Sequence, residues 1–142
     1  MSTIPEVLNT TENAQIDLSE EISFNLLAQE GSIDWFFCHH GTTGETFVLA
    51  TAGNEESIFH VTRLLKNEFS HRAKLSVNWS IPPQRYTYYQ GRYALVYRPF
   101  TYRTLADVLC MPPGTLSEFL SCAAKLCGTL SMVHQNGLVH GD

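Results

Sequence analysis

The stretch that decides the fold is Leu130-Ser131-Met132-Val133-His134-Gln135-Asn136-Gly137-Leu138-Val139-His140-Gly141-Asp142. It begins as the end of a helix. Gly137 is placed to stop that helix, because a residue without a Cβ adopts the left-handed backbone of the C′ position without a clash. The apolar pair Leu138-Val139 is then expected to form a short, buried strand. His140 and Asp142 follow as a polar tip at the end of that strand.

A long amphipathic helix leads into this stretch. Thr115-Leu116-Ser117-Glu118 matches the capping box, in which a Ser or Thr and a Glu three residues later satisfy each other's free backbone N–H groups. Apolar residues then recur at helical spacing as far as Asn136, which predicts one core-forming face. A shorter helix at residues 105–109 and the loop Met111-Pro112-Pro113-Gly114 are expected before it.

Five short runs upstream have the alternating or strongly apolar pattern of strands. They cover residues 22–28, 34–38, 46–50, 86–89 and 93–97. Short turns connect the first three, which predicts an antiparallel meander, and Gln90-Gly91 is expected to close a hairpin between the last two. The predicted fold class is therefore α+β with a five-stranded antiparallel sheet. Residues 1–20 lack any period and are predicted to be a disordered lead-in.

A single long helix separates the third strand from the fourth. Asn54 is its expected N-cap, and the helix is expected to run to about Leu75. One stripe of this helix faces the sheet, and it consists of Ile58, Val61, Leu65, Phe69 and Arg72. Glu68 lies beside that stripe, so it is either a solvated helix charge or the partner of a cation near the sheet.

Length, composition and net charge argue against several classes of function. With 142 residues, 44% of them hydrophobic, the chain suits one domain with a core. The net charge of −5 argues against nucleic acid as a partner. No apolar run approaches the roughly 18 residues of a membrane span, and the polar start does not resemble a signal peptide. Neither membrane insertion nor export is therefore expected.

The potential metal ligands show no metal-binding spacing. The four cysteines, Cys38, Cys110, Cys122 and Cys127, include no C-x-x-C pair. We therefore expect buried thiols in a reducing, cytoplasmic compartment. His39-His40-Gly41 is expected to be a polar hairpin tip, since no further ligands stand nearby in the sequence. No metal site is predicted.

The order of these elements resembles the protein-kinase family. Three strands, a helix carrying an acid, two strands, a linker and a helix before a His-x-Asp triplet form the order of a kinase small lobe entering its large lobe. The resemblance implies a small lobe at 21–97, and a hinge with the start of a large lobe at 98–142. This is about the first half of such a domain, so the chain is expected to be a fragment.

The most similar group is the kinase-like domain at the head of large hybrid sensor histidine kinases of fungi and bacteria. The similar phrases are Arg92-Tyr93-Ala94-Leu95-Val96-Tyr97, the helix from Leu116 to Leu130, and His134-Gln135-Asn136-Gly137-Leu138-Val139-His140-Gly141-Asp142. In that family, large-lobe helices would cover the apolar face of this helix. We therefore expect the face to be exposed here and to favour aggregation.

The resemblance assigns nucleotide-binding positions, and several are altered. A kinase covers the ATP phosphates with a Gly-rich loop, but the matching turn Gln29-Glu30-Gly31-Ser32 holds only Gly31, beside an acid. The third-strand lysine, which holds the α- and β-phosphates, is replaced by Ala50. Glu68 matches the acid that pairs with that lysine. ATP and Mg²⁺ are thus expected only in the complete domain, with impaired binding.

The remaining matches lie at the hinge and in the catalytic loop. Tyr97 would lie at the back of the nucleotide cleft, and Arg98-Pro99-Phe100 would form the hinge. Its backbone groups would contact adenine, which makes Arg98 and Phe100 cofactor-binding candidates. In His140-Gly141-Asp142, Asp142 matches the catalytic residue that accepts the substrate proton. His140 would brace the loop, and glycine replaces the usual arginine.

These matches predict a pseudokinase that serves as the regulatory input domain of a hybrid sensor histidine kinase in phosphorelay signalling. Its expected partner is the rest of the parent protein, which would be an ATP-dependent kinase. The chain itself lacks the metal-binding Asn and the Asp-Phe-Gly segment that catalysis needs. Two alternatives stay open. One is part of an active Ser/Thr kinase with Asp142 as base, and the other is a non-catalytic protein-interaction domain.

Overall fold

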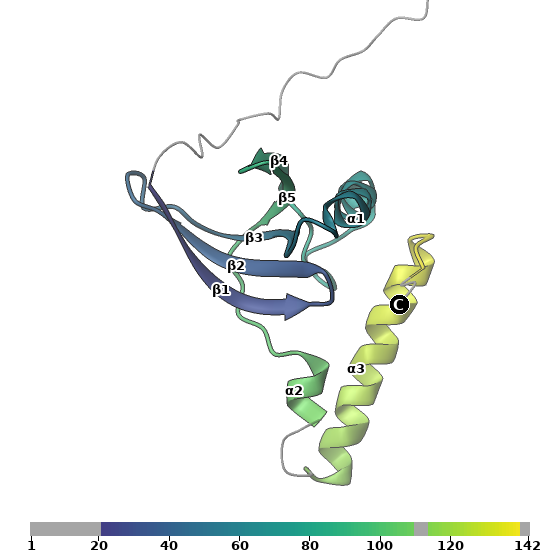
Figure 1. The fold of residues 1–142 in the computed structure, drawn as a ribbon. Helices are drawn as coiled ribbons and strands as arrows, with labels where there is room; N and C mark the ends of the chain where they lie inside the picture. Colours follow the sequence, from purple (N-terminus) through teal and green to yellow (C-terminus); the bar gives the residue numbers. More distant parts are fainter. Residues whose placement is uncertain (1–20, 110–113, 140–142) are drawn as a thin grey trace, which may run out of the picture.

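The computed structural model describes residues 21–109 and 114–139. The predicted lead-in at 1–20, Cys110 and the triplet His140-Gly141-Asp142 lie outside the described residues. The described part is an α+β arrangement built on a five-stranded antiparallel sheet, which confirms the predicted fold class at that level. Figure 1 shows one helix against the sheet and two further helices that follow it in the chain.

Strands occupy the five positions that the sequence pattern predicts, each extended by one or more residues. They are β1 (Ile22–Glu30), β2 (Ile33–His40), β3 (Thr46–Ala52), β4 (Arg85–Tyr89) and β5 (Arg92–Tyr97). Their order in the sheet is β1-β2-β3-β5-β4, so β3 and β5 are neighbours although a helix separates them in the chain. The two edge strands are β1 and β4.

The helix α1 (Ile58–Ser70) covers one face of the sheet (Figure 1). Its Val61 and Leu65 lie one turn apart and are both buried. They belong to a core cluster whose other members come from the central strands. These members are Val48, Ala50, Ala52, Leu95 and Tyr97. The predicted inward stripe is thereby confirmed at its centre.

The ends of α1 differ from the prediction. The helix begins after Ser57, and the Asn54 side chain instead accepts a hydrogen bond of 2.9 Å from the Ser57 N–H in the preceding turn. The helix also ends earlier than expected, and a 3-10 turn, η1 (Arg72–Lys74), follows it. Arg72 therefore leaves the inward stripe, and its guanidinium lies 4.1 Å from the centre of the Phe69 ring.

The opposite face of the sheet carries a second core cluster. Its buried members are Cys38, Phe47, Leu49, Ala94 and Val96. The edge strands meet over it, because Phe24 of β1 stacks on Tyr89 of β4 with ring centroids 5.2 Å apart. Since β1 and β4 lie at opposite edges, this contact requires a strongly curled sheet. Tyr86 of β4 and Tyr93 of β5 also pack across the strands, with parallel rings whose centroids lie 5.1 Å apart.

Two helices follow the sheet. The linker after β5 leads to α2 (Leu105–Leu109) and then to α3 (Leu116–Gln135). The predicted capping box of α3 is confirmed: the Glu118 N–H donates to Thr115 Oγ1 at 3.3 Å, and the Thr115 N–H donates to Glu118 Oε2 at 2.7 Å. Gly137 follows the end of α3 with a positive φ of 67°, as its position in the sequence predicts.

The residues after Gly137 differ from the prediction. Leu138 and Val139 form no strand, and Val139 is 84% exposed, so the expected buried strand is wrong. A strand needs a neighbour for its backbone hydrogen bonds. The described strands all belong to one sheet that does not include this pair.

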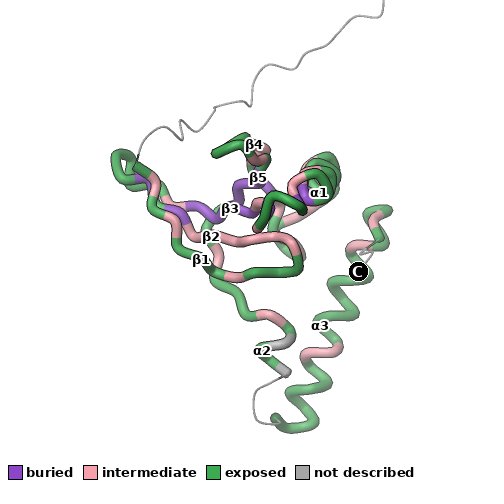
Figure 2. Tube along the Cα trace, in the orientation of Figure 1, coloured by how far each residue is buried: buried purple, intermediate pink, exposed green. Residues whose placement is uncertain are grey.

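The α3 helix is exposed along its length, as Figure 2 shows, and none of its residues is buried. Its large exposed apolar side chains confirm the predicted apolar surface. They are Leu116, Phe119, Leu120, Leu126, Leu130 and Met132. By length and composition alone the helix could also cross a membrane. Helices that pack inside soluble proteins can meet the same criteria, so this is weak evidence for a membrane span.

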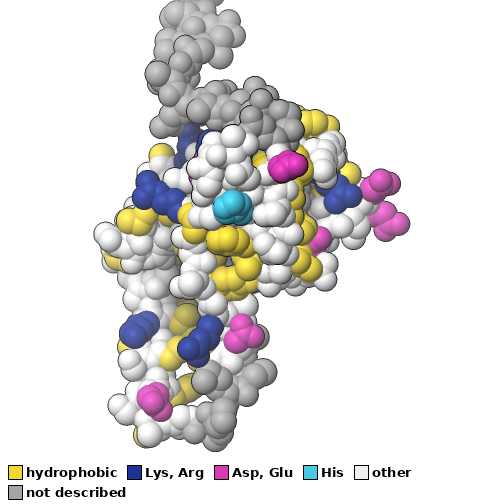
Figure 3. Space-filling model, turned by 90° about the vertical axis from the view of Figure 1, so that its left-hand side faces the viewer, with side chains coloured by type: hydrophobic (Ala, Val, Ile, Leu, Met, Phe, Trp, Pro, Cys, Tyr) yellow, Lys and Arg dark blue, Asp and Glu magenta, His cyan; other side chains and the backbone are white. Residues whose placement is uncertain are grey.

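The surface charge is mixed. Figure 3 shows one face on which acidic and basic side chains are interspersed and hydrophobic side chains gather near the middle. Arg85 of β4 pairs with Glu45 before β3, with 3.1 Å between Arg85 Nη2 and Glu45 Oε1. A solvent-exposed pair of this kind contributes at most about 1 kcal/mol to stability.

Cys38 is expected to resist alkylation until the protein unfolds. Burial raises the pKa of its thiol to about 12, so almost no thiolate is present at pH 8. The prediction of buried thiols holds for Cys38 and is wrong for Cys127, which is exposed on α3 and therefore serves as the matched control. Mass spectrometry of peptides after iodoacetamide treatment should show Cys127 modified and Cys38 unmodified, with both modified in denaturant. Equal labelling of the two thiols in the folded protein would contradict this burial.

Candidate functional site

Ala50, at the position of the expected lysine, lies inside β3 and has no exposed surface. Its backbone partners are Trp35 of β2 and Leu95 of β5. Its side chain belongs to the core cluster that packs under α1. The position is therefore filled by a packed methyl group and presents no polar atom to a ligand.

Glu68 of α1 has a hydrogen-bond partner that the sequence did not indicate. The Tyr97 hydroxyl donates to Glu68 Oε1 at 2.8 Å, and Tyr97 comes from the end of β5 in the same core cluster as Ala50. Partial loss of solvent raises the pKa of the Glu68 carboxyl, and the hydrogen bond from Tyr97 lowers it by less. Burial and the nearby carboxylate raise the pKa of Tyr97, so the phenol keeps the proton that it donates.

The contact with Tyr97 changes both predicted roles of Glu68, the solvated helix charge and the partner of a cation near the sheet. The residue as a whole keeps a large exposed surface, as a solvated helix charge would. Its carboxylate end is nevertheless partly buried and engaged by the Tyr97 hydroxyl. A phenol supplies a hydrogen bond but no positive charge. It therefore satisfies the carboxylate without providing the cation that would bind phosphate.

Aromatic side chains surround Tyr97. The Trp35 ring lies 5.4 Å from the Tyr97 ring, and the Phe100 ring meets it edge-on at 6.4 Å. The Trp35 indole N–H is buried and has no hydrogen-bond partner among the described residues. These rings contribute packing rather than donors for a phosphate or ribose. They occupy the part of the sheet that the resemblance assigns to the back of the nucleotide cleft.

The turn that would cover the phosphates is short. β1 and β2 stay paired as far as Glu30 and Ile33, which leaves only Gly31 and Ser32 in the turn. Gly31 has a φ of +58°, which favours glycine in a tight hairpin. The turn therefore offers one glycine, and the neighbouring Glu30 carboxylate would repel a triphosphate.

The hinge candidates lie on the linker after β5. Arg98 is exposed, and Phe100 is half-buried against Tyr97. Because His140 and Asp142 lie outside the described residues, the structure does not place the predicted catalytic residues relative to Glu68. Of the predicted site residues, the structure brings Ala50, Glu68 and Phe100 together around Tyr97.

The histidine pair at the β2–β3 hairpin has a structural role. His39 is exposed, whereas His40 is buried and its Nδ1 accepts a hydrogen bond of 3.3 Å from the Thr43 N–H. This bond helps to hold the hairpin closed. Both histidines belong to β2 and His40 is 5% exposed, so the predicted polar hairpin tip is wrong for His40. Within residues 21–109 and 114–139, no group of three or more His, Cys, Asp or Glu side chains is arranged to hold a metal ion.

Comparison with known proteins leaves the family open. No protein-family model matches the chain, and no curated protein matches it significantly.

The raised pKa of Glu68 predicts a pH dependence of stability. Its ordinary value is 4.5, and the folded protein holds the proton above that pH while the unfolded chain releases it. Stability should therefore fall as the pH rises through the window between the two pKa values. Glu68→Gln should flatten this fall and keep an oxygen that accepts the Tyr97 hydroxyl. Urea unfolding between pH 4 and pH 7 measures the slope, and Glu55→Gln, at an exposed residue, is the control. A variant slope equal to that of the wild type would contradict the assignment.

Proposed function

We propose that the chain is a kinase-like regulatory domain without phosphotransfer activity, serving as an input module of a larger cytoplasmic hybrid sensor histidine kinase. The observation that carries the proposal is the hydrogen bond between Tyr97 and Glu68, in a core that also contains the buried Ala50. The acid that would hold a phosphate-binding lysine is engaged by a neutral phenol. The lysine's own position is a packed methyl group.

The arrangement of elements supports the kinase-like part of the proposal. A curled five-stranded sheet carries one helix between its third and fourth strands, and this helix packs on the central strands β3 and β5. An irregular linker then leads to two helices, the second of which is amphipathic and exposed. The exposed face of α3 supports a role through contact with the rest of the parent protein.

The active-kinase alternative requires another cation in place of the missing lysine. Lys66 on α1 and Lys74 in η1 are the lysines closest in sequence to Glu68, and both are exposed. The turn at Gly31 is a second obstacle, because it has one glycine and the neighbouring Glu30 would repel phosphate. A regulatory role needs neither feature, so we favour it.

The proposal that the chain is part of a larger histidine kinase can be tested directly. An antiserum against residues 21–109 should detect a polypeptide far larger than 16.0 kDa in cells that express the gene. That polypeptide should autophosphorylate on histidine. A single species of 16.0 kDa would contradict the role as part of a larger signalling protein.

Asp142 separates the regulatory role from the active kinase. In the full-length protein, Asp142→Asn should leave all phosphotransfer unchanged, because the proposal assigns that chemistry to the histidine kinase core. Loss of Ser or Thr phosphorylation in this variant, in a protein that still folds, would favour the active kinase.

A further inference from the structure

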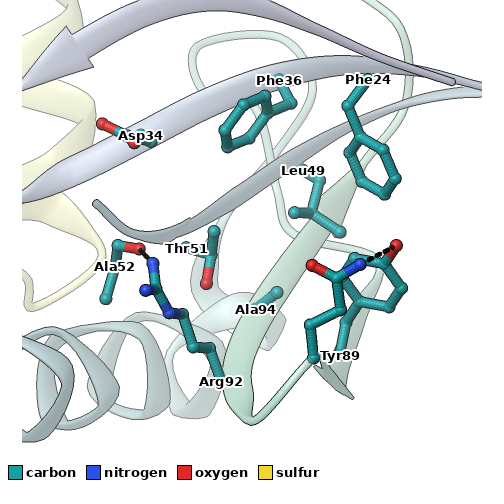
Figure 4. A pocket seen from close by; sticks show the side chains of 10 residues that line it. Phe24, Asp34, Phe36, Leu49, Thr51, Ala52, Tyr89, Arg92 and Ala94 are labelled. Atoms are coloured by element: carbon teal, nitrogen blue, oxygen red, sulfur yellow. Dashed lines mark hydrogen bonds between the residues drawn. The ribbon is translucent and has the colours of Figure 1, made fainter. Parts of the chain in front are cut away.

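A cavity of about 240 Å³ lies on the face of the sheet opposite α1 (Figure 4). Its apolar wall comes from four different strands, and the residues are Phe24, Phe36, Leu49 and Ala94. The stack of Phe24 on Tyr89 closes one side, because it joins the two edges of the curled sheet. Ala50 and Tyr97, two of the expected nucleotide positions, pack on the face under α1, so this cavity is separate from them.

Two opposite charges line the same cavity. The Arg92 guanidinium is held by a 2.6 Å hydrogen bond from Nη1 to the Ala52 carbonyl oxygen, and within the described residues it forms no ion pair. The Asp34 carboxylate accepts one hydrogen bond, from Gln29 Nε2 at 3.1 Å. Figure 4 shows Asp34 and Arg92 at one end of the cavity, and Phe24 and Tyr89 at the other.

A strained turn places a third polar group at the cavity. Gln90 adopts a left-handed backbone with φ of +47°, followed by Gly91 at +81°. This two-residue hairpin turn favours Asn at its first position, because a longer L side chain is disfavoured in the left-handed region. The Gln90 Nε2 donates to Tyr89 Oη at 2.8 Å, which leaves its carbonyl oxygen as an acceptor. Strain of this kind persists where the side chain has a use.

We propose that this cavity binds a small zwitterion of the amino-acid class, with an apolar side chain. Arg92 would bind the carboxylate in a charge-assisted hydrogen bond. Asp34 would bind the ammonium group at the same end of the cavity, and the aromatic wall and the Tyr89–Gln90 pair at the other end would cover the side chain. A plain carboxylate would be repelled by Asp34 and a plain amine by Arg92, so a ligand with both charges fits best. The proposal goes beyond the regulatory role and does not depend on the kinase-like assignment.

The test is an NMR titration of the full chain with L-phenylalanine and L-leucine. We expect L-phenylalanine to shift the backbone amides of Thr51 and Ala94 at concentrations up to about 20 mM, the range in which a weak fragment-sized ligand binds. The analogues 3-phenylpropionate and phenethylamine carry one charge each. They should bind at least about tenfold more weakly, because each loses a charge-assisted contact. No shifts with either amino acid, or equal shifts with the analogues, would overturn the proposal.

Three variants separate a lost contact from a lost fold. Asp34→Asn should weaken L-phenylalanine binding but strengthen 3-phenylpropionate binding, because the repulsion of its carboxylate disappears. Arg92→Gln should produce the reverse preference, favouring phenethylamine. Gln90→Asn should raise the melting temperature by relieving the strained turn and still weaken L-phenylalanine binding. Unfolding cannot cause these opposite changes, so equal affinities in all variants that remain folded would overturn the proposal.

Discussion

Replacing Ala50 with lysine is expected to destabilise the fold by about 3 kcal/mol or more and to confer no nucleotide binding. The side chain has no exposed surface, and its strand partners Trp35 and Leu95 are large. Overfilling a packed core costs about 1–3 kcal/mol, and burial of an ammonium group adds a further cost unless it gains a partner. The partner that the resemblance assigns to such a lysine is Glu68, but Tyr97 already engages it.

Ala50→Met is the matched control, because methionine adds comparable length without charge. Urea unfolding should show the lysine variant less stable than the methionine variant, which separates charge from volume. A lysine variant as stable as the wild type, with newly acquired ATP binding, would mean that the cleft retains the geometry of an active kinase. That result would contradict the conclusion that core packing closes this position and that Tyr97 keeps Glu68 from a lysine.

Replacing Tyr97 with alanine is expected to destabilise the fold by about 3–5 kcal/mol, as for other buried aromatic residues truncated to alanine. Tyr97 is 2% exposed, and its ring contacts Trp35 and Phe100. The hydroxyl alone contributes less. Tyr97→Phe should cost only about 1 kcal/mol, because water can reach the exposed side of Glu68 and replace the lost hydrogen bond.

Equilibrium unfolding of both Tyr97 variants checks this prediction. Tyr88→Ala is the control, since Tyr88 is exposed on the edge strand β4. Its loss should matter much less than the loss of Tyr97. If Tyr97→Ala loses no more stability than Tyr88→Ala, Tyr97 does not make a large contribution to the core under α1.

The five strands and the order of elements could be predicted because their signals are local. Alternating apolar residues mark the strands, and the positive φ values of Gln90 and Gly91 match the predicted hairpin turn. The capping box at Thr115 likewise depends on residues only three positions apart. Such patterns do not need the rest of the chain in order to be interpreted.

The site could not be predicted to the same depth, because it depends on pairing across the sheet. The contact of Tyr97 with Glu68 joins residues 29 positions apart. The signal that could have found it is the β3–β5 register, which places Tyr97 opposite Val48, on the face covered by α1. The cavity around Arg92 needs the curl of the whole sheet. The prediction of a strand at Leu138-Val139 is wrong for a related reason, because an apolar pair forms a strand only beside another strand.

The described elements follow the order that the resemblance predicts. The proposed regulatory domain differs from an active kinase in a few altered positions. Under the proposed assignment, Ala50, the turn at Gly31 and the Tyr97–Glu68 contact would each remove one part of a phosphate site. The exposed face of α3 then becomes the surface through which a regulatory domain would act. Each alteration is a separate residue, so each can be tested by substitution.

Nucleotide binding tests the central claim most directly. The 142-residue chain, with its fold checked by NMR, is titrated with ATP and Mg²⁺ to about 5 mM while its melting temperature is followed. The account predicts no shift at any concentration, and the same result without Mg²⁺. A melting temperature that rises steadily with ATP concentration, as mass action requires of a ligand bound by the folded state, would contradict it.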